Sequence, residues 1–258
     1  MFRLMKNEWK KLKSPVLGAI AILSLVACIL SSTLYLDYSL YYDIEAWEIG
    51  TELIGFLFPL FVVIPICWNM YYERKNNFLL YTMPRVSKRK YLTAKWLTSA
   101  ISSFFILFIP YFLSAIFALY VKSPIDPYAT ADVSVTPFRH IFLELFTQTP
   151  LLYAFLLSCW KSLIGIFVMS LGFVLSLYVD NIFVILTGPF IYEILENFIL
   201  SILGLEKYRL VTAFEPTSLA TESIAIGSFL MGLLVISIVI VAVWLYFGKI
   251  KRIPVFKV

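Results

Sequence analysis

The sequence contains little charge: only 14% of its 258 residues are Asp, Glu, Lys or Arg, while 61% are hydrophobic. A soluble protein of average composition carries about 25% charged residues, which cover its surface. Hydrophobic runs near or above 18 residues recur along the whole chain, and such a run is long enough to cross a bilayer as a helix. The composition excludes an ordinary soluble domain. It predicts an all-α, polytopic membrane protein that forms a single transmembrane domain over residues 1–258.

Sequence motifs of enzymes are also missing. The chain has one histidine, His140, and three cysteines, all of which lie inside hydrophobic runs. It lacks the phosphate loop G-x-x-x-x-G-K-[ST], the zinc motif H-E-x-x-H and the nucleophile motif G-x-S-x-G. We therefore predict no catalytic residues, no metal site and no cofactor bound by this chain. Energy for transport against a gradient would have to come from an ion or from a partner protein.

Six membrane-spanning helices fit the hydrophobic runs. They are predicted at residues 16–36, 53–71, 96–121, 158–178, 182–203 and 224–247. Pro59 and Pro65 are predicted to interrupt the second helix. Apolar residues recur at three- and four-residue steps in residues 1–14, which predicts an amphipathic helix at the membrane surface, with an unstructured basic anchor as the alternative. Residues 122–157 and 204–223 are predicted to be outer loops with short helices.

The distribution of basic residues predicts the orientation of the chain in the membrane. Sixteen of the 21 Lys and Arg residues precede the first predicted span, lie between the second and third, or follow the sixth. Only three of the 16 acidic residues lie on that side. Because Lys- and Arg-rich loops stay in the cytoplasm, both termini and residues 73–95 are predicted to be cytoplasmic.

Ionisable residues within the predicted fourth and fifth spans form a second group of interest. These residues are Lys161, Glu193 and Glu196. Ionisable residues inside membranes usually have partners or functions. Since a tight turn joins the two spans, we expect Lys161 to reach Glu196 as a structural pair, or the charges to line an outer vestibule on the substrate path. Proton transfer by the acids is the alternative.

Residues 73–95 combine basic clusters with a short apolar segment, Phe78-Leu79-Leu80-Tyr81. Pro84 disfavours helix at Met83, and Ser87 can cap a new helix that leads into the third span. These features predict a short apolar helix across the cytoplasmic ends of two spans. It would either dip into the lipid surface or dock in a groove of a cytoplasmic partner.

A pattern of residues runs through the same segment and continues into the third span. It consists of Glu73, Leu79-Leu80, Pro84, Ser87, Arg89, Tyr91 and Lys95. This pattern resembles the loop between the second and third spans of ABC-2-type transporter permeases. By its length and six spans, the chain is also similar to compact permeases of Gram-positive bacteria that export or resist amphipathic and antimicrobial peptides.

The resemblance implies a dimer of two permease copies or homologues in the bacterial plasma membrane. Each would bind a separate cytoplasmic ABC ATPase, which holds ATP and Mg²⁺. The residues implied to form the ATPase-coupling helix are Glu73, Asn76, Asn77, Phe78, Leu79, Leu80, Tyr81 and Met83. The aromatic residues implied to line a substrate path are Phe61, Trp68, Tyr71, Phe190 and Tyr192, although they could instead face lipid.

The function implied is export of a hydrophobic or amphipathic substrate, such as a peptide, an antimicrobial or a lipid-like molecule. Two alternatives stay open. The first is an ion-coupled secondary carrier, and the second is a non-transporting membrane scaffold or sensor. The lipid bilayer is a predicted partner in each case, and no nucleic-acid partner is predicted.

Overall fold

The structure is a computed structural model that describes residues 1–38, 40–76, 78, 87–124, 142–216 and 226–251. Within these residues, six helices are long and apolar enough to cross a membrane, and no strand occurs. The prediction of an all-α membrane protein with six spans is therefore confirmed. The outer-loop histidine, His140, and most of the predicted coupling helix lie outside the described residues.

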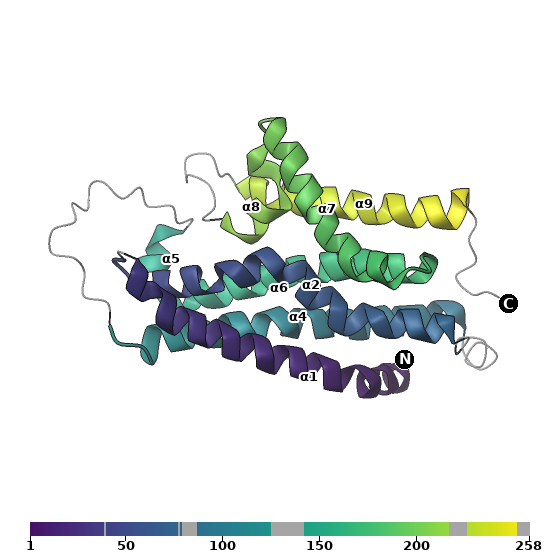
Figure 1. Cartoon of the computed structure of the whole chain (residues 1–258), viewed down its shortest axis with the longest axis horizontal. Helices are drawn as coiled ribbons and strands as arrows, with labels where there is room; N and C mark the ends of the chain where they lie inside the picture. The colour runs from purple at the N-terminus through teal and green to yellow at the C-terminus, as the bar shows by residue number, and fades with distance from the viewer. Residues whose placement is uncertain (39, 77, 79–86, 125–141, 217–225, 252–258) are drawn as a thin grey trace.

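The six long helices follow one another with short elements between them (Figure 1). They are α1 (Phe2–Thr33), α2 (Glu45–Lys75), α4 (Lys88–Tyr120), α6 (Pro150–Tyr178), α7 (Ile182–Ile202) and α9 (Ile226–Leu245). The short elements are η1 (Leu34–Asp37), α5 (Leu143–Gln148), η2 (Glu206–Tyr208), α8 (Leu210–Phe214) and the π-helical turn η5 (Tyr246–Ile250), which extends α9.

Several helices are longer than the predicted spans. Residues 1–14 and 16–36 are not separate helices, because α1 runs through Pro15 to Thr33. Likewise α2 runs uninterrupted through Pro59 and Pro65, so the predicted interruption was wrong. Membrane helices tolerate proline because neighbouring helices and polar side chains satisfy the backbone groups that it frees. The fourth span begins at Pro150 rather than at residue 158, because proline suits the first turn of a helix.

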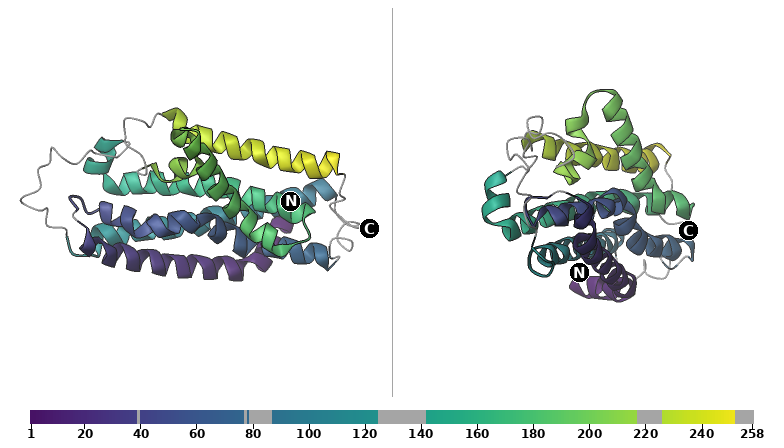
Figure 2. Two further views of the ribbon diagram at one scale, coloured as in Figure 1. Left: turned by 45° about the horizontal axis from the view of Figure 1, so that its top comes forward. Right: turned by 60° about the vertical axis from the view of Figure 1, so that its left-hand side comes forward.

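The helices α1, α2, α4 and α6 form the main bundle, and α9 runs along its outside (Figures 1 and 2). In α2, α4 and α6, half of the most apolar 18-residue window is buried inside the protein, against 11% in the last spanning helix. Gly165 of α6 permits close packing, since an added Cβ would lie 2.6 Å from a Leu107 methyl of α4. The main bundle therefore contains the core, and α9 leaves most of its surface to lipid.

One end of the bundle contains the start of α1, the end of α2, the start of α4, the end of η5 and the turn between α6 and α7 (Figure 1). At this end Arg74 of α2 donates to Asp180 Oδ1 at 2.8 Å and to the Val179 carbonyl in the α6–α7 turn. We call it the terminal end. At the opposite end lie η1 and α5, and α8 packs between α7 and α9.

Candidate functional site

A cluster of ionisable residues, all buried except Lys11, lies at the terminal end, and we call it the terminal cluster. Its members are Glu8 and Lys11 of α1, Glu73 of α2, and Tyr91 and Lys95 of α4. Glu8 and Lys11 are three residues apart, and Tyr91 and Lys95 are four apart, so each pair shares one face of its helix. Glu73 lies in the last turn of α2. The cluster thus joins the ends of three helices.

The bonds within the terminal cluster form a closed network. Lys11 Nζ lies 2.7 Å from Glu8 Oε1 and 2.8 Å from Glu73 Oε1. Lys95 Nζ pairs with Glu73 Oε2 and lies 3.3 Å from Glu8 Oε2. The Tyr91 hydroxyl donates to Glu73 Oε2 at 3.0 Å. Two ammonium groups thus balance two carboxylates, which is the arrangement that makes buried charge tolerable.

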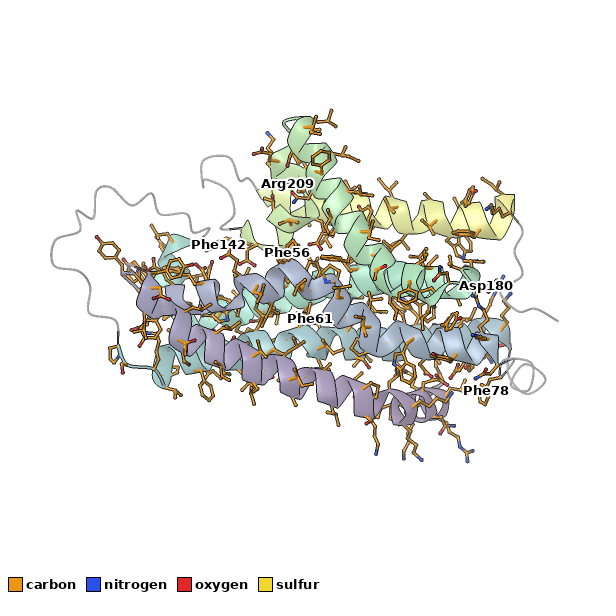
Figure 3. All side chains as sticks on the ribbon, in the orientation of Figure 1. Phe56, Phe61, Phe78, Phe142, Asp180 and Arg209 are labelled. Atoms are coloured by element: carbon orange, nitrogen blue, oxygen red, sulfur yellow. The ribbon has the colours of Figure 1, made fainter. Side chains whose placement is uncertain are left out.

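Beside the terminal cluster lies an open groove of about 350 Å³, at the end of α2. Its lining residues are Lys11, Asn69, Tyr72, Glu73, Asn76 and Phe78. The Phe78 ring is 44% exposed and lies 4.8 Å from Lys11 Nζ, within the range of a cation–π contact. Figure 3 shows Phe78 at the same end as Asp180. An exposed aromatic side chain therefore stands directly on the buried network.

The predicted coupling residues divide between these features. Glu73 was predicted to belong to a cytoplasmic loop, but α2 continues to Lys75 and buries Glu73 in the terminal cluster. Asn76 ends α2, and Ser87 directly precedes α4 as predicted, although its side chain makes no capping hydrogen bond. Lys88–Lys95 belong to α4. The remaining coupling residues lie outside the described residues: Asn77, Leu79, Leu80, Tyr81 and Met83.

The predicted substrate-path residues do not converge on one cavity within the described part of the chain. On α2, Tyr71 is buried in the core, Phe61 is partly buried against it, and Trp68 is exposed. On α7, Phe190 packs edge-on against Phe56 of α2 with ring centroids 5.7 Å apart.

Two of the predicted residues do share a cavity. Tyr192 and Glu196 line an apolar groove of about 490 Å³ between α7 and α9. Its other lining residues are Gly188, Ile191, Leu195, Ile199, Leu200 and Val235.

A second buried ion pair lies near the opposite end of the bundle. Lys161 was expected to reach Glu196, but the structure pairs it with Glu215, at 2.7 Å, just after α8. Glu196 instead accepts the Leu210 backbone N–H with both carboxylate oxygens, at 3.0 and 3.1 Å. The short helix α8 thus lies where α6 and α7 were expected to meet, and it separates the two predicted partners.

The pocket around Lys161 is aromatic. Its ammonium lies 4.6 Å from the Tyr111 ring, 5.3 Å from the Phe214 ring and 5.6 Å from the Trp47 ring. Lys161 is 1% exposed. Burial raises the pKa of the Glu215 carboxyl above its ordinary value, and the Lys161 ammonium opposes that shift. This pair fastens α8 to the main bundle.

Sequence reasoning missed the terminal cluster as a unit. Tyr91 and Lys95 belonged to the recognised pattern, and Glu8 and Lys11 were visible only as a helical pair of opposite charge. The signal that could have joined them was the presence of a few acids among many bases on the side predicted to be cytoplasmic.

Comparisons of the chain with protein-family models, with curated proteins and with solved structures found no significant match.

Proposed function

We propose that this chain is the membrane-spanning subunit of an ATP-driven exporter of the ABC-2 type. One observation carries the proposal: Tyr91 and Lys95 both donate to Glu73 Oε2, although they lie 18 and 22 residues from Glu73 in the sequence. These are three residues of the pattern that resembles the ABC-2 permeases. Their contact gives the pattern a structural role at the connection through which an ATPase would act.

In the proposed assembly, a separate cytoplasmic ATPase binds ATP and Mg²⁺ and contacts residues 76–87. The terminal cluster joins the last turn of α2 to the first turns of α4 and to α1. Because buried ion pairs resist separation, a push on the connection would displace these three helices together. The cluster would thus convert a local contact into movement of the bundle.

We assign the terminal end to the cytoplasmic side of a bacterial plasma membrane, because the basic residues concentrate in the segments at that end. Two copies, or this chain and a homologue, would form the complete pathway. The apolar groove beside Tyr192 favours a hydrophobic or amphipathic substrate.

The proposal is tested by replacing Phe78 in the full chain, co-expressed with each candidate ABC ATPase from the same genome. Phe78→Asp should lower co-purification of the ATPase about tenfold or more, because loss of an aromatic anchor from an interface costs about 2 kcal/mol or more. The matched control is Phe142→Asp, at the opposite end of the bundle, where the aromatic side chain is also exposed (Figure 3). This control should bind like the wild type.

A second variant, Leu79→Asp/Leu80→Asp, extends the test along the predicted coupling segment. If the Phe78 variant and this double variant both retain the ATPase at the wild-type level, the coupling assignment is wrong. The ion-coupled alternative makes the opposite prediction: the chain reconstituted alone would transport in response to a proton or sodium gradient, without ATP.

A further inference from the structure

Glu193 is a carboxyl group in an unusual place. It lies eleven residues into the 21-residue helix α7, or about 17 Å along it, which is near the middle of the span. Its side chain is 4% exposed. Its Oε2 atom is fully buried and has no hydrogen-bond partner in the described part of the chain. A buried polar group normally has such a partner, so this one needs an explanation.

The neighbouring carboxylate, Glu196, provides an informative contrast. It lies three residues further along α7, so the two side chains are neighbours on the helix surface. Both oxygens of Glu196 accept the Leu210 N–H, and the Arg209 guanidinium lies near enough to interact with it electrostatically. Glu196 therefore has a hydrogen-bond donor, the Leu210 N–H, and a nearby cation, the Arg209 guanidinium. Glu193 faces the negative charge of Glu196 across one turn.

The cations on the surrounding elements are bonded to other groups. Lys161 of α6 pairs with Glu215, and Arg209, between η2 and α8, donates to Asn197 and Ser201 at 2.9 Å. From α4, the group that interacts electrostatically with Glu193 is the Tyr111 hydroxyl, which donates to the Thr51 carbonyl of α2.

Two acids on α2, Glu48 and Glu52, interact electrostatically with Glu215 rather than with Glu193. The charge that acts on Glu193 is that of Glu196. This neighbour and the burial of the side chain both disfavour a negative charge on Glu193.

An ionised carboxylate in such a position would carry a large desolvation cost, and no cation within the described residues is paired with it to offset that cost. The neutral acid avoids that cost. We propose that Glu193 is a proton-binding site inside the membrane-spanning part of α7, occupied at neutral pH. Release of the proton requires water or a cation to reach the carboxylate, and hence a displacement of α7 from α2 and α6, the two long helices of the main bundle that it contacts.

The packing of α7 allows such a displacement. In its most apolar window, 22% of the residues are buried, against 50% in α2 and α4. Pro189 lies one turn before Glu193 and removes a backbone donor from the helix. In Figure 1, α7 rises away from the main bundle toward its C-terminal end. The apolar groove between α7 and α9 borders the same turns. Protonation of Glu193 and the position of α7 are therefore linked, whether or not an ATPase binds at the terminal end.

The test is infrared spectroscopy of the purified full chain in lipid at neutral pH, comparing wild type with Glu193→Gln. A protonated carboxyl in an apolar environment absorbs at a higher wavenumber than a carboxylate. We expect the variant to lose one such band, and the matched control Glu196→Gln, one turn away, to keep it. The proposal is overturned if Glu193→Gln leaves the protonated-carboxyl region unchanged and removes a carboxylate band instead.

A measurement on the wild type keeps the proposal testable should the variant fail to fold. Alkaline titration of the wild type, with carbon-13 in glutamate carboxyls, should convert the protonated band into carboxylate absorption. Absence of any protonated glutamate band at neutral pH would refute the site. Neither result depends on ATPase binding, so failure of this inference and failure of the proposed exporter function are separable.

Discussion

Replacing Lys95 by methionine should destabilise the protein strongly. The Lys95 ammonium is buried between Glu73 and Glu8, and methionine keeps much of the side-chain length while removing the charge. The variant would leave two buried carboxylates with one ammonium, that of Lys11. Removing one partner of a buried ion pair costs about 3–5 kcal/mol. At this chain length 1 kcal/mol corresponds to about 2–4 °C in Tm, so the expected decrease is roughly 6–20 °C.

Charge balance can be restored by a second substitution. Glu8 is the more distant partner of Lys95, at 3.3 Å, and Glu8→Gln removes its charge while keeping its shape. The double variant Lys95→Met/Glu8→Gln retains the Lys11–Glu73 pair. Since residues in one network couple by about 0.5–3 kcal/mol, it should recover on the order of 1–3 kcal/mol of the lost stability.

The assay is thermal unfolding of each purified variant in detergent, followed by intrinsic fluorescence and checked by size exclusion. Lys90→Met is the matched control, because Lys90 lies in the first turn of the same helix and is exposed. It should change stability by no more than about 0.5 kcal/mol. If Lys95→Met resembles this control, or if the double variant is no more stable than the single one, charge balance does not hold the three helix ends together.

Two further predictions concern helix packing and capping. Gly50→Ala should lower the free energy of unfolding by about 1–3 kcal/mol, because the added Cβ would collide with the Ser31 backbone of α1. Gly18→Ala, which has open space around it, should instead stabilise α1 by up to about 1 kcal/mol. Thermal unfolding of the two variants should show changes in Tm of opposite sign. Glu196→Ala should remove the acceptor of the Leu210 N–H and cost about 0.5–2 kcal/mol, seen as faster hydrogen exchange at residues 206–214, and unchanged exchange there would contradict the capping role.

The spanning helices were predictable because hydrophobic length is a local property of the sequence. All six were found, and the errors lie at their ends and at prolines. The second span was predicted to begin at residue 53 and the fourth at residue 158, yet residues 45–52 and 150–157 are also helical. A helix of 31 residues is about 46 Å long and exceeds the hydrocarbon core of about 30 Å, so its polar ends extend beyond the part that hydropathy detects.

The partners of the buried charges were not predictable from spacing alone. Lys161 and Glu196 lie on helices joined by a tight turn, which made their pairing reasonable. The competing element, α8, has only five residues and carries no strong pattern, yet it brings Glu215 to Lys161 and gives Glu196 a backbone donor. Such contacts depend on the rotation of each helix about its own axis and on a short outer element, which one sequence does not specify.

The two buried ion groups together divide the bundle into a fixed part and a movable part. The terminal cluster fastens α1, α2 and α4 at one end, and the Lys161–Glu215 pair fastens α8 against the rings of Trp47 and Tyr111 near the other. Separating these paired ions is costly in a medium of low dielectric constant, so each group resists displacement of the elements that it joins. The two helices outside this frame, α7 and α9, are the least buried of the later spans and border the apolar groove. In the proposed exporter, a substrate path that opens and closes would form beside α7, where a buried carboxyl oxygen of Glu193 has no hydrogen-bond partner in the described part of the chain and where Pro189 removes a backbone donor from the helix.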